Sequence, residues 1–251
     1  MTRPLAVVIM AAGKGTRMNN PGMAKVMYTI ADKPMVEHVV DLAHAMHAER
    51  VVAIVGWQKD SVIDHLRGTG KKVDCVEQNP QLGTGHAVMQ AEKPLQGFQG
   101  DVLVLSGDVP LLSLATVQRL LDHHRASPAA ATVLTAVLPD ATGYGRILRA
   151  GGTGDVTGIV EHKDATEEQR AIREINSGIY VFDSARLFEG LAQITPNNVQ
   201  KEYYLTDVFQ YLWSKHLPVR AIAADDPIEI QGINTVQQLE DARGVYAQRH
   251  G

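Results

Sequence analysis

Two cationic side chains lie close to a glycine-rich segment near the start of the sequence. Gly13 and Gly15 belong to "AAGKGTRM", and Arg17 and Lys25 follow soon after. Both glycines can adopt positive φ, and successive backbone amides in such a turn form a concave anion site. At an effective dielectric constant of about 20, one charge pair at 4 Å contributes roughly 4 kcal/mol. The segment predicts a polyphosphate-binding loop; the alternative is an ordinary turn with a solvated basic edge.

Two familiar glycine-rich phosphate motifs do not match this loop. A P-loop requires G-x-x-x-x-G-K-[ST], but Lys14 is followed by Gly15, and the position five before Gly13 is Val8. The Rossmann pattern G-x-G-x-x-G fails because Met18 stands at its third glycine. A P-loop kinase is therefore disfavoured.

A second glycine-rich turn occurs in "QNPQLGTGHA", at the end of another strand-like run. The side-chain amide of Gln78 and the backbone around Gly83 suit the hydrogen-bonding edge of a base, with Thr84 available beside them. The alternative is a glycine-rich helix start without a ligand.

Two further polar residues follow apolar runs. Asp108 in "LVLSGDVPL" comes just past the strand-like run 102–105, where a carboxylate is well placed for Mg²⁺. The alternative is a turn residue before Pro110. Asn234 in "IQGINT" precedes the last expected helix, and an N-cap is its simplest explanation.

Three polar or small residues in the second half of the chain suit a sugar. Gly145 lies in "TGYGRI", Glu161 ends the strand-like part of "GIVEHKDAT", and Asn176 begins the strand-like part of "EINSGIY". Glutamate and asparagine can bind hydroxyl and amide groups, although such residues are also common at strand ends.

These residues must be positioned by alternating strands and helices. Strands are expected at 5–10, 51–56, 72–78 and 101–107, and helices at 35–48, at 60–68, from 86 and at 114–126. This alternation predicts βαβ units on a mainly parallel sheet with helices on both faces, and ligands bind at the carboxyl ends of such strands.

The pattern changes after Ala130. Strands are expected at 132–138, 144–150, 156–162 and 176–183 with little helix between them, then a helix at 202–216, a strand at 219–225 and a helix at 235–249. The strand-rich part predicts antiparallel pairing within the same sheet or a small lobe beside it. We expect one α/β domain with two lobes over residues 1–251.

Composition excludes several classes of protein. The net charge of −4 argues against nucleic-acid binding, and no apolar stretch is long enough to span a membrane. No signal sequence is evident, so a cytoplasmic protein is expected. Cys75 is the single cysteine, which excludes an internal disulfide, and the histidines lack the spacing of a metal site.

The order of the motifs resembles one enzyme family. "AAGKGTRM", "QLGTGHA", "GDVPL", "TGYGRI", "GIVEHKDAT", "EINSGIY", "EYYLTD" and "GIN" occur in one chain. The chain is similar, over nearly all of residues 4–250, to the uridyltransferase domain of bacterial N-acetylglucosamine-1-phosphate uridyltransferases. The resemblance implies a Rossmann-like nucleotidyltransferase fold with a small sugar-binding lobe.

The resemblance also implies a role for each matching residue. It assigns the uridine site to Met10, Ala11, Ala12 and Gly13, and the reading of uracil to Gln78, Gly83 and Thr84. It assigns the triphosphate to Arg17 and Lys25, and Mg²⁺ to Asp108 and Asn234. Sugar and neighbouring substrate contacts fall to Ser106, Gly107, Gly145, Glu161, Asn176, Tyr204 and Thr206.

The activity implied is transfer of UMP from UTP to N-acetylglucosamine 1-phosphate, with Mg²⁺ as cofactor. Two positions depart from the family: Ala24 replaces the proline before Lys25, and Ser106 replaces a frequent tyrosine. Ala24 predicts a looser loop, and Ser106 leaves open another sugar 1-phosphate. A non-catalytic nucleotide-sugar sensor is the remaining alternative. The family's bifunctional members continue into a β-helix of hexapeptide repeats, which this sequence does not show, so the resemblance gives no basis here for acetyltransferase activity.

Overall fold

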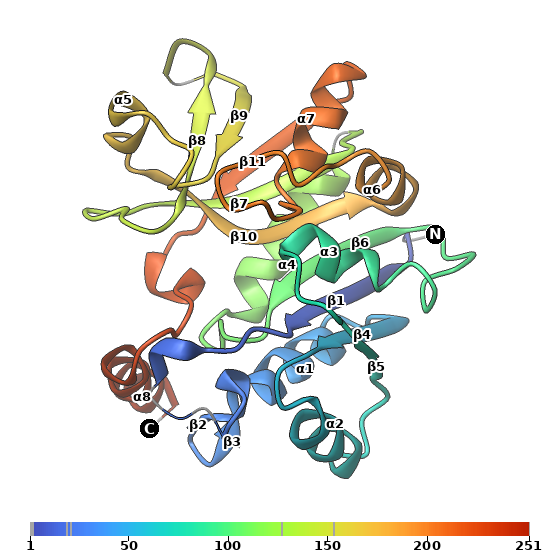
Figure 1. Cartoon of the computed structure of the whole chain (residues 1–251), viewed down its shortest axis with the longest axis vertical. Coiled ribbons are helices and arrows are strands. Elements are labelled where there is room, and N and C mark those ends of the chain that lie inside the picture. Colours follow the sequence, from blue (N-terminus) through green and yellow to red (C-terminus); the bar gives the residue numbers. More distant parts are fainter. Residues whose placement is uncertain (1–2, 19, 21, 127, 153, 251) are drawn as a thin grey trace.

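A mixed β-sheet forms the centre of the computed structural model, which describes residues 3–18, 20, 22–126, 128–152 and 154–250 (Figure 1). The sheet runs in the order β11-β7-β10-β6-β1-β4-β5. Its strands are β1 (Leu5–Ala11), β4 (Arg50–Val55), β5 (Asp74–Glu77), β6 (Asp101–Ser106), β7 (Ala131–Val137), β10 (Glu174–Asp183) and β11 (Val219–Ala223).

The apolar strand β1 explains how the sheet holds two cores. Leu5, Val7 and Ile9 point into one cluster of buried residues, whereas Ala6 and Val8 point into the other. Successive side chains of a strand face opposite sides, so a continuous apolar run fits a strand that is covered on both faces.

Helices cover both faces of the sheet. One core receives side chains from α1 (Met35–Ala45), α2 (Lys59–Gly68) and α4 (Leu114–Arg125), and the other from α3 (Thr84–Met89), α6 (Ser184–Leu191) and α7 (Asp207–Ser214). A third, smaller cluster joins α8 (Val236–His250) to the hairpin β2 (Thr29–Ile30) and β3 (Lys33–Pro34). The predicted architecture, a mainly parallel mixed sheet flanked by helices, is confirmed.

The strand directions bring distant residues to one edge of the sheet. β1 pairs in parallel with β4 and β6, so their carboxyl ends share that edge. β10 is antiparallel to both β6 and β7, which places its first residues, including Asn176, at the edge where β6 ends. A single reversed strand therefore adds a side chain from late in the sequence to the edge where the carboxyl ends of β1, β4 and β6 lie.

The predicted small lobe is an extension of the same sheet. β8 (Gly145–Arg149) pairs with the start of β10 and with β9 (Val156–Val160), and all of these pairings are antiparallel. The short helix α5 (Glu167–Arg170) follows β9, and the lobe stands at one end of the molecule (Figure 1).

Two helical segments differ from the sequence prediction. α6 was not expected, although Asp183 caps it and Leu187 and Leu191 have helical spacing. The helix expected over 202–216 begins only at α7, because the backbone of Tyr203 bonds to the loop before α3: its amide donates to Leu82 O at 2.8 Å, and its carbonyl accepts from the Gly85 amide at 2.8 Å.

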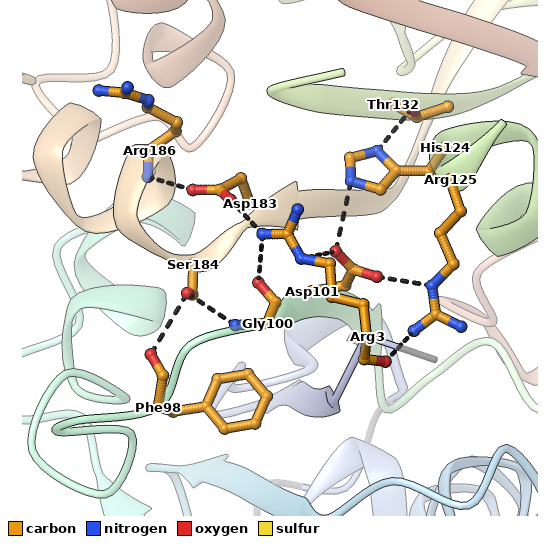
Figure 2. A network of polar contacts seen from close by, with 10 residues as sticks. All are labelled: Arg3, Phe98, Gly100, Asp101, His124, Arg125, Thr132, Asp183, Ser184 and Arg186. Atoms are coloured by element: carbon orange, nitrogen blue, oxygen red, sulfur yellow. Dashed lines mark hydrogen bonds and ion pairs between the residues drawn. The ribbon is translucent and has the colours of Figure 1, made fainter. Parts of the chain in front are cut away.

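A buried ionic network lies where β6 begins (Figure 2). Asp101 is fully buried and forms ion pairs with Arg3 at 3.0 Å and with Arg125 at 2.7 Å. Arg3 also pairs with Asp183, and His124 Nε2 lies 3.7 Å from Asp101. The network ties the segment before β1 to β6, to the end of β10 and to the last turn of α4.

Within the described residues, no helix combines the length and apolar character needed to cross a bilayer. The cytoplasmic location stays a prediction.

Candidate active site

The loop after β1 brings its glycines and cations together. Gly15 has a φ of +62°, and a Cβ at this position would lie 2.5 Å from the Cβ of Lys25. Gly15 therefore permits the close approach of Lys25, and its left-handed conformation favours glycine. The expectation for Gly13 was wrong in part: its φ is not positive, and nothing lies within 4 Å of a Cβ built there.

Lys25 lies at the centre of a cluster that joins three distant segments. Its ammonium donates to Asp108 Oδ2 and, at 2.9 Å, to Asn234 Oδ1. Arg17, exposed in a short 3-10 helix, donates to the same Asn234 oxygen at 3.0 Å. The loop after β1, the end of β6 and the segment before α8 thus meet at one charged point.

The conformation of residue 24 bears on how firmly Lys25 is held. Ala24 is buried and has a φ of −63°, which is the value that a proline ring imposes. The backbone before Lys25 therefore has a proline-like conformation without a proline. The looser loop that was expected from Ala24 stays a prediction.

The alternative explanation of Asn234 as an N-cap does not hold. Thr235 takes that role, because its hydroxyl accepts from the Gln238 amide at 3.2 Å, and Gln238 Oε1 accepts from the Thr235 amide at 3.1 Å. The side-chain nitrogen of Asn234 donates to Gly232 O at 3.0 Å, which turns its Oδ1 toward the cations.

These residues fit a divalent cation. A carboxylate oxygen of Asp108 and the amide oxygen of Asn234 both approach one positive charge, the ammonium of Lys25. Magnesium commonly takes one or two protein oxygens and completes its shell with water and substrate phosphates. Asp108 and Asn234 would hold the ion, and Lys25 would then be available to phosphate oxygens.

A cavity of about 350 Å³ opens beside this cluster. Ten of the expected residues line it: Met10, Ala11, Ala12, Gly13, Lys25, Gln78, Gly83, Thr84, Ser106 and Asp108. Four lining residues were not singled out from the sequence, namely Val26, Gln81, Ala87 and Glu202. Gln81 stands three residues after Gln78 in the same glycine-rich turn, and Glu202 begins "EYYLTD", so both belong to motifs already noted.

The residues that were expected to bind the base are held in place by hydrogen bonds. Gln78 is buried and its Nε2 donates to Gly83 O at 2.9 Å, while among the described residues its Oε1 has no hydrogen-bond partner. The Thr84 hydroxyl accepts from the Leu205 amide at 3.0 Å. Gly83 has a φ of +106°, and a Cβ there would lie 2.6 Å from Tyr203 O. This turn therefore presents one amide oxygen to the cavity.

The expected sugar-binding residues form a second cluster at the β8–β9–β10 junction. Asn176 pairs with Gly145 in the sheet, and a Cβ at Gly145 would lie 3.4 Å from both Asn176 Cβ and Glu161 Oε2. Thr206 donates to Glu161 Oε1 at 3.1 Å. Burial raises the pKa of the Glu161 carboxyl, with further increases from the carboxylates of nearby aspartates.

Several of the expected residues also make hydrogen bonds within the fold. The Tyr204 hydroxyl donates to Asp164 at 3.2 Å and accepts from Gln200 at 2.8 Å, and burial raises its pKa to about 12. Asn176 donates to the Tyr180 hydroxyl at 2.8 Å. The Gly107 amide donates to Met10 O at 2.9 Å, so the residue that follows β6 is bonded to β1.

Sequence comparison places the chain in a family. Residues 6–227 match the nucleotidyl transferase family, and the chain belongs to it. This nucleotidyltransferase is 48% identical over 242 residues to "Bifunctional protein GlmU" of Brevibacillus brevis and 46% identical over 248 residues to the protein of the same name from Streptomyces avermitilis. These alignments cover 96% and 98% of the chain but 51% of each relative, so the chain spans about half their length.

Solved structures show the same fold. A UDP-glucose pyrophosphorylase complexed with UDP-glucose superposes with a TM-score of 0.77 at 19% sequence identity, covering 100% of both chains. An apo UDP-glucose pyrophosphorylase gives a TM-score of 0.78 at 18% identity, again over the full length of both chains. At this identity the likeness concerns the fold alone.

Proposed function

We propose that this protein transfers UMP from UTP to N-acetylglucosamine 1-phosphate, releasing pyrophosphate and forming UDP-N-acetylglucosamine. The observation that carries the proposal is the convergence of Lys25, Arg17, Asp108 and Asn234 beside the cavity of the nucleotide-binding residues. The names of the relatives, and their sequence identity to this chain over about half of their own length, support the same assignment.

The chemistry is an in-line displacement at the α-phosphorus of UTP. The attacking group is the phosphate oxygen of the sugar 1-phosphate, which is already anionic and needs no general base. Catalysis then consists of positioning and charge neutralisation. Lys25 and Arg17 carry positive charge to the phosphates, where negative charge grows on the departing pyrophosphate. A bound Mg²⁺ at Asp108 and Asn234 would supply further positive charge and orientation.

Uracil selectivity is proposed to follow from the orientation of Gln78. Because its Nε2 donates to Gly83 O, its Oε1 is the group left to accept a hydrogen bond in the cavity. Uracil N3 carries a proton that can donate to this oxygen, whereas cytosine N3 is itself an acceptor. A buried polar group left without a partner lowers affinity strongly, so UTP should be preferred over CTP.

A second candidate is transfer to a different sugar 1-phosphate. Ser106 lines the nucleotide cavity, and its Oγ lies 4.0 Å from the position of a Cβ at Gly178, on the strand that carries Asn176. A small residue at this point leaves room beside the substrate. The sensor alternative is disfavoured because a binding module has no need of the cationic and metal-ligand residues together.

Pyrophosphate release tests these functions together. The assay uses UTP, CTP or dTTP with N-acetylglucosamine 1-phosphate, glucose 1-phosphate or galactose 1-phosphate, with and without Mg²⁺. We expect Mg²⁺-dependent release with UTP and N-acetylglucosamine 1-phosphate. A higher rate with another sugar would select the second candidate, and binding of UDP-N-acetylglucosamine without turnover of any pair would select the sensor.

A further inference from the structure

Arg146 is a buried arginine in the sugar-side lobe that the proposed chemistry does not use. Its side chain, in the middle strand β8, is 2% exposed. None of the ion pairs among the described residues includes it, and its Nε has no hydrogen-bond partner there. Burial lowers the pKa of its guanidinium. The charge of Asp140 acts in the opposite direction on this pKa, although no carboxylate of the described residues forms an ion pair with Arg146. A buried charge without an ion pair is costly, so the contacts that hold it need an explanation.

The guanidinium of Arg146 donates its hydrogen bonds to backbone carbonyls of two separate segments. Nη1 donates to Tyr144 O, in the turn that leads into β8, and Nη2 donates to Arg170 O at 3.3 Å, at the end of α5. A guanidinium is a planar group with several donors, so it can fix two carbonyls at once. Arg146 thus joins the turn before β8 to the helix that follows β9.

The turn that Arg146 holds contacts both halves of the candidate active site. Gly145 lies against Asn176 and Glu161 in the sugar-side cluster. Tyr144 packs against the main core, and its phenol lies near Asp108 and the backbone of Gly232: burial, and then the charge of Asp108, raise the pKa of the phenol, and the Gly232 backbone acts to lower it. Gly232 in turn lies next to the carboxylate of Asp108, since a Cβ there would be 3.5 Å from Asp108 Oδ2.

We propose that Arg146 is a positioning residue for the sugar 1-phosphate: it fixes the Tyr144–Gly145 turn between the sugar-side cluster and the Asp108–Asn234 pair. This inference rests on the proposed function, because it names the substrate whose site the turn forms. It does not place Arg146 in contact with any reacting atom. Loss of Arg146 should therefore weaken binding of the sugar portion and leave the nucleotide cavity, formed by other loops, unchanged.

The test compares Arg146→Met and Arg146→Lys with Arg149→Met. Arg149 lies on the same strand but pairs with Glu174 and donates to Gly154 O, so its loss removes an ion pair of the lobe without a bond to the turn. Steady-state kinetics would give KM for each substrate, calorimetry would give affinities for UDP-N-acetylglucosamine and UTP, and thermal unfolding would report folding.

For Arg146→Met we expect KM for the sugar 1-phosphate to rise about tenfold or more, as two lost hydrogen bonds imply. KM for UTP should change by less than about twofold. Arg146→Lys should raise KM for the sugar 1-phosphate by a smaller factor, and Arg149→Met should not change KM for one substrate more than for the other. The inference would be overturned if Arg146→Met raised KM equally for both substrates, or if the folded Arg146 variants left both KM values unchanged. It would also be overturned if Arg149→Met raised KM for the sugar 1-phosphate alone, or if both Arg146 variants failed to fold. A wild-type protein that does not bind UDP-N-acetylglucosamine would instead overturn the proposed function, and the inference with it.

Discussion

Two polar clusters lie at opposite ends of β6, and they contain similar residues. At its first residue, Asp101 is fully buried between Arg3 and Arg125 (Figure 2). Just past its last residue, Asp108 is half-buried beside Lys25. Each cluster joins at least one carboxylate to cations from distant segments, and yet only the second of the two has the expected properties of a catalytic site.

The difference lies in where the charges are directed. Around Asp101 the guanidinium groups bond to carboxylates and to backbone carbonyls, as Arg125 does with Arg3 O at 2.6 Å. Around Asp108, two cations share one amide oxygen of Asn234 next to a cavity lined by glycine and alanine backbone. Cavity volume alone would select the wrong cluster as the candidate site, because the cavity beside Arg3 and Asp101 measures about 710 Å³ and the cavity beside Asp108 about 350 Å³.

Asp108→Asn should produce the largest loss of activity. Loss of the carboxylate removes one metal ligand, and we expect kcat to fall by about 10²–10³, the range seen when one preorganised electrostatic contact is removed. The decrease in Tm should be smaller than for the change at Asp101. Pyrophosphate release against Mg²⁺ concentration would measure the effect, and a near-normal rate would remove Asp108 from the mechanism.

Asp101→Asn should lower the stability of the protein and leave its activity nearly unchanged. Removing the buried carboxylate leaves Arg125 without its ion-pair partner and Arg3 with Asp183 alone, and we expect the free energy of unfolding to fall by about 3 kcal/mol. The kcat of the folded fraction should stay within about twofold of wild type, since the nucleotide cavity lies at the other end of β6. Urea unfolding and active-site titration would test this. A large loss of kcat in fully folded Asp101→Asn protein would contradict the idea that the Asp101 cluster contributes to stability and not to catalysis.

The same cluster should make stability depend on pH. Burial lowers the pKa of His124 from 6.5 to about 4. Between these values the unfolded chain binds more protons than the folded chain, so this contribution to stability is complete above pH 6.5 and is lost as the pH falls toward 4. The difference corresponds to roughly 3 kcal/mol. Urea unfolding at several pH values would measure the loss, and His124→Gln should flatten it. If the free energy of unfolding of His124→Gln changed with pH as steeply as that of the wild type, other titrating groups would be responsible for the pH dependence.

Ala24→Pro should have the smallest effect, at the catalytic end. The φ of −63° suits proline, and among the described residues the Ala24 amide donates no hydrogen bond. We expect the free energy of unfolding to rise by about 0.4–1 kcal/mol, because the unfolded chain loses freedom. Ala24→Gly should lower it. Both changes can be measured by thermal unfolding, and destabilisation by proline would show that the backbone before Lys25 cannot accept the ring.

Local pattern predicted the elements that place the catalytic end. The apolar run of β1, the helical spacing in α1 and the polar residues at strand ends follow from periodicity. The parallel order of β1, β4 and β6 then sets the glycine-rich loop beside Asp108. These features could be predicted because each depends on a short stretch of chain.

The features that the sequence analysis did not predict depend mostly on contacts between segments that are far apart in the chain. The insertion of β10 between β6 and β7 is decided by contacts between segments far apart in sequence. The same holds for the bonds that the Tyr203 backbone makes with Leu82 and Gly85, which delay the start of the expected helix, and for Arg146, whose guanidinium donates to carbonyls rather than to side chains. The capping of α8 by Thr235 was a local signal, but it competed with Asn234 one residue before.

A crystal structure with UDP-N-acetylglucosamine and Mg²⁺ tests the central claim most directly. It should place the uracil against Gln78, the ion between Asp108 and Asn234, and the acetamido sugar against Gly145 and Asn176. A product molecule bound in the Arg3–Asp101 cavity, with the loop after β1 unoccupied, would contradict the account.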